Sequence, residues 1–95
     1  MYSIKVQKAF PLDNGVVLVY FEDGKVKTFD TKTLIPDYPE FESLLNSDIF
    51  NCLRVEPGGY GISWNEDLDC SEGELYDNGI EVSPESFSLL SSKSC

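Results

Sequence analysis

Hydrophobic and polar residues alternate along the first third of the chain. In residues 3–10, SIKVQKAF, the apolar Ile4 and Val6 alternate with Lys5 and Gln7, which is the period expected for a strand with one solvated face. The Asn14-Gly15 pair then predicts a turn before the β-branched run VVLVYF at residues 16–21. A third extended run follows, so residues 3–30 are predicted to form a three-stranded antiparallel meander.

The second turn of this meander is expected at Asp23-Gly24. A two-residue type I′ turn suits this pair, because glycine accepts a positive φ without a Cβ clash. That loop length would place Tyr20 opposite Lys27 on a solvated face. The opposite face, toward the core, would carry Val17, Val19, Phe21 and Val26.

Helical spacing replaces alternation in the middle of the chain. Apolar residues recur at i, i+3 and i+4 after Asp37, which is predicted to cap a helix with Glu40 completing a capping box. A second short helical turn is expected to begin with Ser47 as its cap. The apolar side chains that these turns would direct into the core are Phe41, Leu44, Leu45, Ile49, Phe50 and Leu53.

The next segment predicts a second hairpin and a short helix. Residues 56–59, EPGG, fit a turn with proline at its second position and glycine at its third. After the hairpin, Ser71 is predicted to cap a helix with Glu74 in the capping-box position, and Asn78-Gly79 is a natural helix stop. One face of the second strand would carry Tyr60, Ile62 and Trp64.

These elements predict an α+β fold of two layers, in the order β-β-β-α-β-β-α. Residues 1–79 are expected to form a single domain, which suits a chain of 95 residues. Residues 80–95 are expected to be a partly flexible C-terminal extension. Within it, Ser83 and Pro84 could start one helical turn that presents Phe87 and Leu90.

Charge is distributed unevenly along the chain, whose formal net charge is −10. Residues 1–33 hold five lysines against four acids, whereas residues 34–95 hold two basic residues against thirteen acids. A surface of this sign repels phosphate backbones and attracts basic partners. The charge distribution therefore disfavours nucleic acid as a partner, although plain solubility explains it equally well.

Several kinds of chemistry are disfavoured by the residue types present. The chain has no histidine, which removes the commonest general base and transition-metal ligand. Cys70 is the one candidate nucleophile, but the acids around it oppose a thiolate. The run DLDCSEGELYDN fails as a calcium loop, because its glycine falls one position late and Asn78 replaces the required glutamate. We expect a protein that is not an enzyme and has no catalytic residues, metal or cofactor.

Cysteine spacing and hydropathy predict a cytoplasmic protein. Cys52, Cys70 and Cys95 are far apart and form no CxxC pair, so reduced thiols are expected. No apolar run approaches the length of a membrane span, and the first ten residues lack the apolar stretch of a signal peptide.

The order of several short motifs resembles the small bacterial family called domain of unknown function 2442 (DUF2442). The phrases LVYFEDGKVKTFD, FESLLNSDIFNCLRVEPGG, ISWNEDLD and ELYDN follow the family's pattern over about residues 2–78. Cys70 departs from it, since the family tends to have proline there. The matching positions are Phe21, Asp23, Gly24, Phe29, Asp30, Phe41, Leu44, Phe50, Val55, Ile62, Trp64, Asp67, Leu68, Asp69, Leu75 and Tyr76.

This resemblance implies a compact α+β domain with a non-enzymatic role. Members of the family are often encoded beside a small toxin and described as its antitoxin half. Some relatives carry an added helix-turn-helix, for which residues 80–95 are too short. The resemblance thus implies a bacterial antitoxin-like protein that binds a protein partner.

Two functional hypotheses follow from the sequence. The first is a protein-binding module that engages a basic partner through its acidic second half, with a homodimer left open as its assembly. Its expected partner-binding residues, an aromatic anchor beside charges, are Trp64, Asn65, Glu66, Asp67, Asp69 and Tyr76. The second is a regulator that binds a small ligand or operator DNA through Lys5, Lys25 and Lys27. For each partner-binding residue, a structural role in the core or a helix cap is the competing interpretation.

Overall fold

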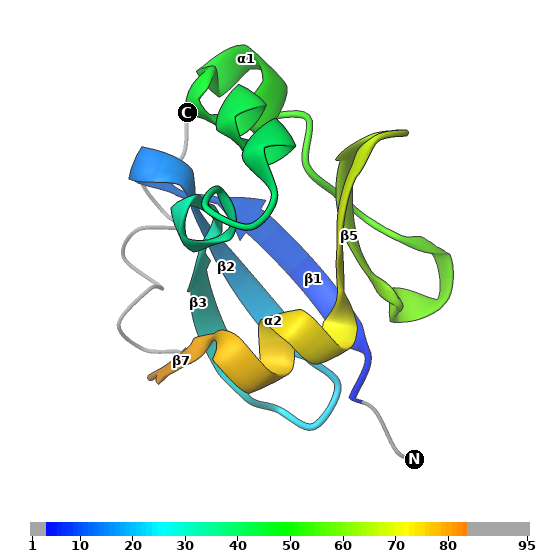
Figure 1. Ribbon diagram of the computed structural model, residues 1–95. Coiled ribbons are helices and arrows are strands. Elements are labelled where there is room, and N and C mark those ends of the chain that lie inside the picture. Colours follow the sequence, from blue (N-terminus) through cyan, green and yellow to red (C-terminus); the bar gives the residue numbers. More distant parts are fainter. Residues whose placement is uncertain (1–3, 84–95) are drawn as a thin grey trace.

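The computed structural model describes residues 4–83, which form two antiparallel sheets and several short helices (Figure 1). The larger sheet has the strand order β1-β2-β3-β7 and the smaller sheet the order β4-β5-β6. The strands are β1 (Val6–Pro11), β2 (Val16–Phe21), β3 (Val26–Asp30), β4 (Arg54–Val55), β5 (Gly61–Asn65), β6 (Leu68–Ser71) and β7 (Ile80–Val82). The helices are α1 (Ser47–Phe50), α2 (Glu72–Asn78) and the 3-10 turns η1 (Asp13–Gly15), η2 (Thr31–Leu34), η3 (Pro39–Leu45) and η4 (Pro57–Gly59).

The predicted meander is confirmed as β1, β2 and β3. Strands β1 and β2 pair with a bulge at Gln7, which keeps Val6 and Ala9 on the same side of the sheet. The structure adds a fourth strand that the pattern did not predict. Residues 80–82, predicted to belong to the C-terminal extension, instead form β7 and pair antiparallel with β3. The helical turn expected after Ser83 lies outside the described residues.

The predicted type I′ turn at Asp23-Gly24 is wrong by one residue. The loop has three residues, because the Phe21 N–H donates to the Lys25 carbonyl at 2.9 Å and the Gly24 N–H donates to the Phe21 carbonyl at 3.0 Å. Gly24 takes φ of 93°, as the third residue of a type I turn with a bulge requires. Asp23 Oδ1 also accepts a hydrogen bond from the Lys25 N–H.

This slip of one residue exchanges the faces of β3. Val19 now lies opposite Lys27, and Tyr20 opposite Val26. Lys27 therefore points to the side of the sheet that carries the core, whereas Val26 points to the other side. The rest of the predicted core face, Val17, Val19 and Phe21, is confirmed as buried.

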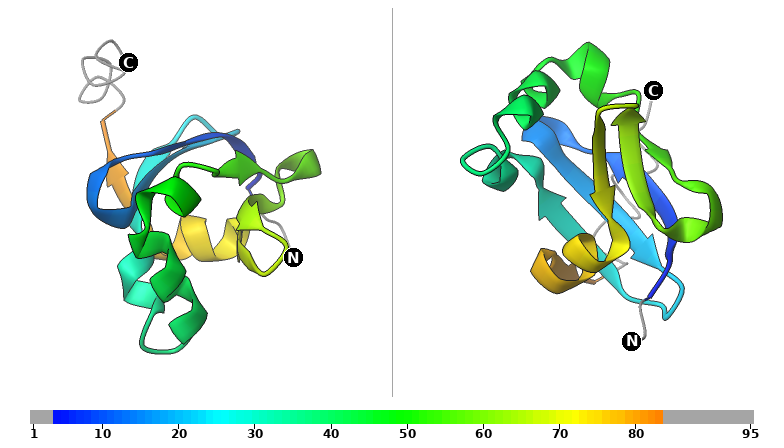
Figure 2. Two further views of the ribbon diagram at one scale, coloured as in Figure 1. Left: turned by 90° about the horizontal axis from the view of Figure 1, so that it is seen from above. Right: turned by 45° about the vertical axis from the view of Figure 1, so that its right-hand side comes forward.

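The core lies between the inner face of the larger sheet and a layer that contains the helices and the smaller sheet (Figure 2). Helix α2 contacts β3, β5 and β6, so it joins the two sheets. Its Leu75 and the β5 residue Ile62 are fully buried. The cluster comprises Val6, Val17, Val19, Phe21, Phe29, Phe41, Leu44, Phe50, Ile62, Trp64, Leu68, Cys70 and Leu75.

Helix capping in the middle of the chain differs from the prediction. The expected capping box of Asp37 and Glu40 is absent, since η3 begins at Pro39 with Tyr38 at its N-cap and no side-chain cap bond. Pro39 disfavours helical dihedrals at the preceding residue, which moves the helix start past the predicted cap. Asn46, rather than Ser47, caps α1 by accepting a hydrogen bond from the Asp48 N–H at 2.9 Å.

The second hairpin is confirmed, and it extends into a third strand. The Asn65 side chain accepts hydrogen bonds from the Asp67 and Leu68 N–H groups, which closes a turn between β5 and β6. We had expected the chain to pass there directly from a strand to a helix. The predicted cap at the start of α2 is confirmed, since Ser71 Oγ accepts from the Glu74 N–H at 3.2 Å.

In the part of the chain that the structure describes, no helix is long and apolar enough to cross a membrane.

Candidate functional site

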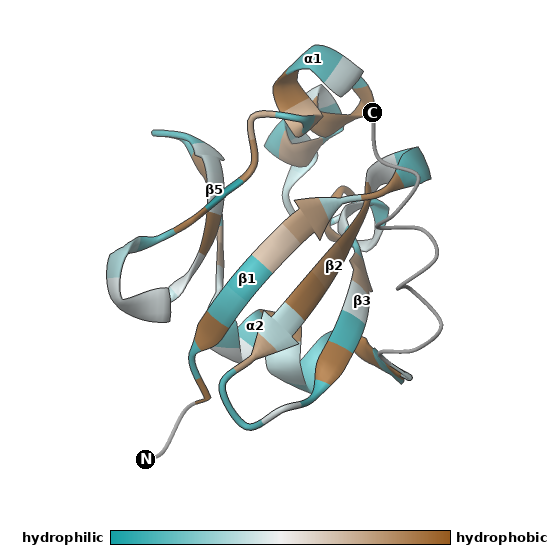
Figure 3. Ribbon diagram, turned by 180° about the vertical axis from the view of Figure 1, so that it is seen from behind, coloured by the Kyte–Doolittle hydropathy of each residue, from teal (hydrophilic) through white to brown (hydrophobic). Residues whose placement is uncertain are grey.

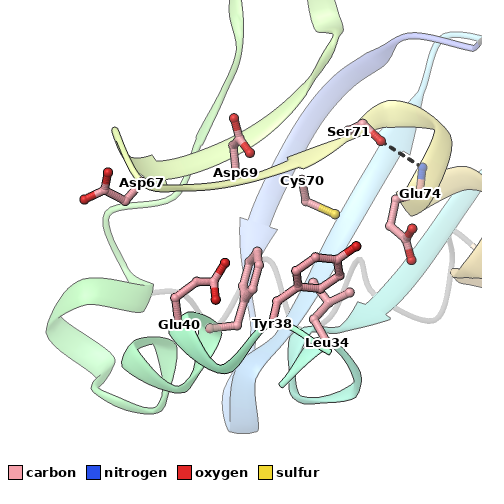
Figure 4. A pocket seen from close by; sticks show the side chains of 9 residues that line it. Leu34, Tyr38, Glu40, Asp67, Asp69, Cys70, Ser71 and Glu74 are labelled. Atoms are coloured by element: carbon pink, nitrogen blue, oxygen red, sulfur yellow. Dashed lines mark hydrogen bonds between the residues drawn. The ribbon is translucent and has the colours of Figure 1, made fainter. Parts of the chain in front are cut away.

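A cavity of about 280 Å³ opens between β6 and the segment that leads from η2 into η3 (Figure 4). The β6 side contributes Asp67, Asp69, Cys70 and Ser71, and the first turn of α2 contributes Glu74. The opposite wall is formed by Leu34, Tyr38, Glu40 and Phe41. The cavity thus brings together segments about thirty residues apart in the chain.

Four of the nine lining residues are acidic, and none is basic. Glu40, Asp67 and Asp69 are exposed, and Glu74 is half-buried. Carboxylates of one sign around a concavity concentrate negative potential, which favours an ammonium or guanidinium group over an anion. Within residues 4–83, however, no group of three or more His, Cys, Asp or Glu side chains is arranged to hold a metal ion.

The Cys70 thiol lies at the back of this cavity, on the opposite side of β6 from the Asp69 carboxylate (Figure 4). Burial, followed by the negative charges of Glu74 and Asp69, raises the pKa of Cys70 to about 12. A thiol with this pKa is protonated at neutral pH and is a poor nucleophile. The acids around Cys70 therefore act on it as the sequence predicted.

The structure brings Asp67 and Asp69 together as expected, and it also explains their spacing. They flank Leu68, whose side chain is buried in the core while both carboxylates stay exposed. Leu68 and Asp69 are neighbours on β6, so their side chains point to opposite sides of the strand, whereas Asp67 lies in the turn that precedes β6. Glu66 is exposed in the adjoining turn, but it does not line the cavity.

Trp64 does not lie at this surface. Its side chain is 3% exposed, and its ring stacks on Phe50 at a centroid distance of 6.3 Å and meets Phe41 edge-on at 6.2 Å. Its Nε1 is buried, and no described residue accepts a hydrogen bond from it. The structure therefore places Trp64 in the core rather than in the exposed position that a partner anchor needs.

Tyr76 belongs to a separate cluster near the β2–β3 turn. Its hydroxyl donates to Asp23 Oδ2 at 2.6 Å, its ring meets Phe21 edge-on, and Lys27 Nζ lies 3.8 Å from the ring centroid. Lys27 Nζ also donates to the Tyr76 carbonyl. The hydrogen bond to Asp23 is the main reason that the pKa of Tyr76 rises to about 12. Tyr76 thus anchors the end of α2 on the larger sheet.

Among the residues that line the cavity, sequence reasoning missed the aromatic Tyr38 and the acidic Glu40 and Glu74 as members of a site. Tyr38 and Glu40 lie in the segment that was predicted only as a helix start, and Glu74 was predicted only as part of a cap. The one signal in the sequence was the excess of acids after residue 34. That excess does not predict which of the acidic residues line the same cavity.

The fold and the cavity define the class of protein. It is a small α+β domain in which two antiparallel sheets and α2 enclose one core, with an acidic cavity beside the edge strand of the smaller sheet. Residues 6–81 match the family described as "Protein of unknown function (DUF2442)", so the chain belongs to this family. The resemblance noted in the sequence is thereby confirmed. No curated protein and no solved structure matches the chain.

Proposed function

We propose that this protein is a non-enzymatic, antitoxin-like module that binds a protein partner by receiving a basic segment at the acidic cavity. The observation that carries the proposal is that four of the nine residues lining the cavity are acidic and none is basic. The partner is expected to be a small toxin encoded beside this protein.

The composition of the cavity supports a protein partner. Tyr38 is exposed at the rim, and its ring meets the buried Phe41 edge-on at 6.3 Å, so a well-supported aromatic stands beside the charges. Aromatic side chains next to charge-complementary groups are typical of the centre of protein interfaces. A cavity of about 280 Å³ has room for a long basic side chain of the partner.

The position of β6 at the edge of the smaller sheet also supports partner binding at the cavity. Strand β6 pairs with β5 on one side only, since the smaller sheet ends at β6. The Glu72 N–H donates to the Tyr60 carbonyl, so these two residues form a hydrogen-bonded pair. Hydrogen-bonded and non-hydrogen-bonded pairs alternate along an antiparallel ladder, so Asp69, opposite Ser63, is in a non-hydrogen-bonded pair and its backbone groups point away from β5. A partner segment at the cavity would therefore meet backbone donors and acceptors beside the carboxylates.

The test is titration of the purified partner encoded beside this protein, at low salt and at moderate salt. Binding should weaken as salt rises, because the attraction between exposed charges is screened. The double variant Asp67→Asn/Asp69→Asn should weaken binding by roughly tenfold or more. The matched control is Glu22→Gln/Asp48→Asn, which removes the same charge from exposed positions outside the cavity. Equal affinities of the two double variants would contradict the proposal.

The alternative function, a regulator that binds operator DNA or a small ligand through the lysines of the meander, has less support. Lys5 lies 4.6 Å from the Tyr60 ring centroid, Lys25 pairs with Glu81 at 3.7 Å, and Lys27 is held by α2. These contacts compete with phosphate for the same charges. A gel-shift titration against the gene's own promoter, with steep salt dependence, would favour this alternative.

A further inference from the structure

The larger sheet has a second face, directed away from the core, that also carries apolar side chains. Residues opposite one another in an antiparallel pair share a face, so the register places Phe10 beside Leu18, Tyr20 beside Val26, and Val82 beside Val26. We call this surface the outer face. Its apolar members are Phe10, Leu18, Tyr20, Val26, Ile80 and Val82.

No described helix or strand lies over the outer face, since the helices and the smaller sheet are all on the other side (Figures 2 and 3). At its centre, Leu18 and Val26 are 3% and 2% exposed, but at its rim Phe10 is 44% and Ile80 70% exposed. Exposed apolar surface costs roughly 25 cal/mol for each Å² left in water. The apolar surface left in water on this face lies at its rim, and exposed apolar surface of this kind is what another segment covers.

The path of the chain indicates which segment is near enough to cover it. Strand β7 is an edge of the sheet and ends at Val82, whose side chain belongs to the outer face. Twelve residues follow Ser83 in the sequence. Fully extended they reach about 40 Å, or about 18 Å as a helix, whereas four strands span roughly 15 Å. Residues 84–95 are therefore long enough to cross the whole face.

The composition of residues 84–95, PESFSLLSSKSC, also suits this face. Pro84 lacks the N–H that would continue the pairing with β3. Phe87 and Leu90 have the spacing that puts two side chains on one side of a helical turn. The segment holds one acid and one lysine, so its side chains carry no net charge, unlike the strongly acidic residues that precede it.

We propose that residues 84–95 dock on the outer face of the larger sheet, with Phe87 and Leu90 covering the patch between Phe10 and Ile80. The segment thereby supplies a second apolar layer to a sheet whose other face already carries the core. A second copy of the chain is the competing occupant of the outer face.

Paramagnetic relaxation tests the position of the segment directly. A nitroxide is attached to Ser88→Cys in a Cys52→Ser/Cys95→Ser background, because Cys70 is buried and its thiol is protonated. Amide signals of β1 and β2 should broaden more strongly than those of η3, which lies on the core side. Equal effects on both sides would overturn the proposal. Broadening that appears only between labelled and unlabelled chains in a mixture would assign the face to a second copy.

A double-mutant cycle in the full chain tests the energetic coupling. The effects of Ile80→Ser and Phe87→Ser on stability should not be additive. The factor by which Ile80→Ser lowers the folding equilibrium constant should be roughly threefold smaller in the Phe87→Ser background than in the parent chain. The matched control is Leu45→Ser, since Leu45 is equally an exposed leucine-sized side chain but lies in η3. Its effect should be independent of Phe87→Ser. Additive effects of Ile80→Ser and Phe87→Ser would overturn the docking.

Discussion

Replacing Trp64 by phenylalanine tests whether this residue is a core side chain or a partner anchor. Its indole is almost completely buried between Phe50 and Phe41, and the Nε1–H finds no acceptor among the described residues. Phenylalanine keeps the six-membered aromatic surface and removes the unpaired donor. Trp64→Phe therefore changes two energy contributions of opposite sign.

The two contributions are of similar size. Losing about two buried carbons costs about 1.6 kcal/mol, and the small cavity left behind adds roughly 1 kcal/mol. Removing a buried donor without a partner returns about 1–3 kcal/mol. The free energy of unfolding of Trp64→Phe should thus lie within about 1.5 kcal/mol of the parent. Trp64→Ala, which removes the whole ring, should lose about 3–5 kcal/mol.

Urea unfolding followed by far-UV circular dichroism measures both variants, because Trp64 is the only tryptophan and its fluorescence disappears with it. Partner binding by Trp64→Phe should equal that of the parent, since the ring is not at the surface. A destabilisation of Trp64→Phe as large as that of Trp64→Ala would refute the reasoning about the unpaired donor. A specific loss of partner affinity in a stable Trp64→Phe protein would restore Trp64 as an anchor.

Three further predictions follow from local geometry. Gly61→Ala should lower the free energy of unfolding by about 2–4 kcal/mol in urea titrations, because Gly61 has φ of 148° and an added Cβ would lie 2.2 Å from the Cys70 carbonyl oxygen. A thiol reagent should modify Cys52 in the folded protein but Cys70 only on unfolding, since Cys52 is exposed and the pKa of Cys70 is raised to about 12; comparable labelling rates would contradict this. Tyr76→Phe should raise the pKa of Asp23 in a carboxyl NMR titration, because the hydroxyl of Tyr76 is the main cause of its lowered pKa and the Lys25 N–H the next. The stability that Asp23 contributes is present above the pKa it has in the unfolded chain, and it is lost as the pH falls through its lower pKa in the folded protein. Tyr76→Phe should therefore make the free energy of unfolding fall less steeply with decreasing pH in this acidic range. An unchanged dependence on pH would argue against the hydrogen bond between Tyr76 and Asp23.

Local signals in the sequence were sufficient for most elements of the fold. The alternation at the start of β1, the β-branched run of β2 and the cap at Ser71 involve neighbouring residues only, so the sequence specifies them directly. Asp23-Gly24 marked the right place for a turn, but not its length. Both a two-residue and a three-residue loop accept glycine, but only the three-residue loop places Phe29 opposite Val17, on the core face where Phe29 is buried.

Other features depended on residues that are distant in the chain. Strand β7 is only three residues long and carries no alternation strong enough to predict it; its partner β3 lies some fifty residues earlier. The sequence alone did not distinguish whether the side chain of Trp64 packs in the core or lies exposed at a partner surface. The contacts with Phe41 and Phe50 that bury it exist only after η3 and α1 fold over β5.

The acidic cavity shows the same division. The sequence by itself determined that residues after position 34 are strongly acidic, and it singled out Asp67 and Asp69 as candidate partner-binding residues. Only the tertiary structure decided that Glu40 and Glu74 join these two, and that Tyr76 lies elsewhere. The physical reason is that a strand's alternation fixes the direction of neighbouring side chains, whereas convergence of distant carboxylates depends on how the whole core packs.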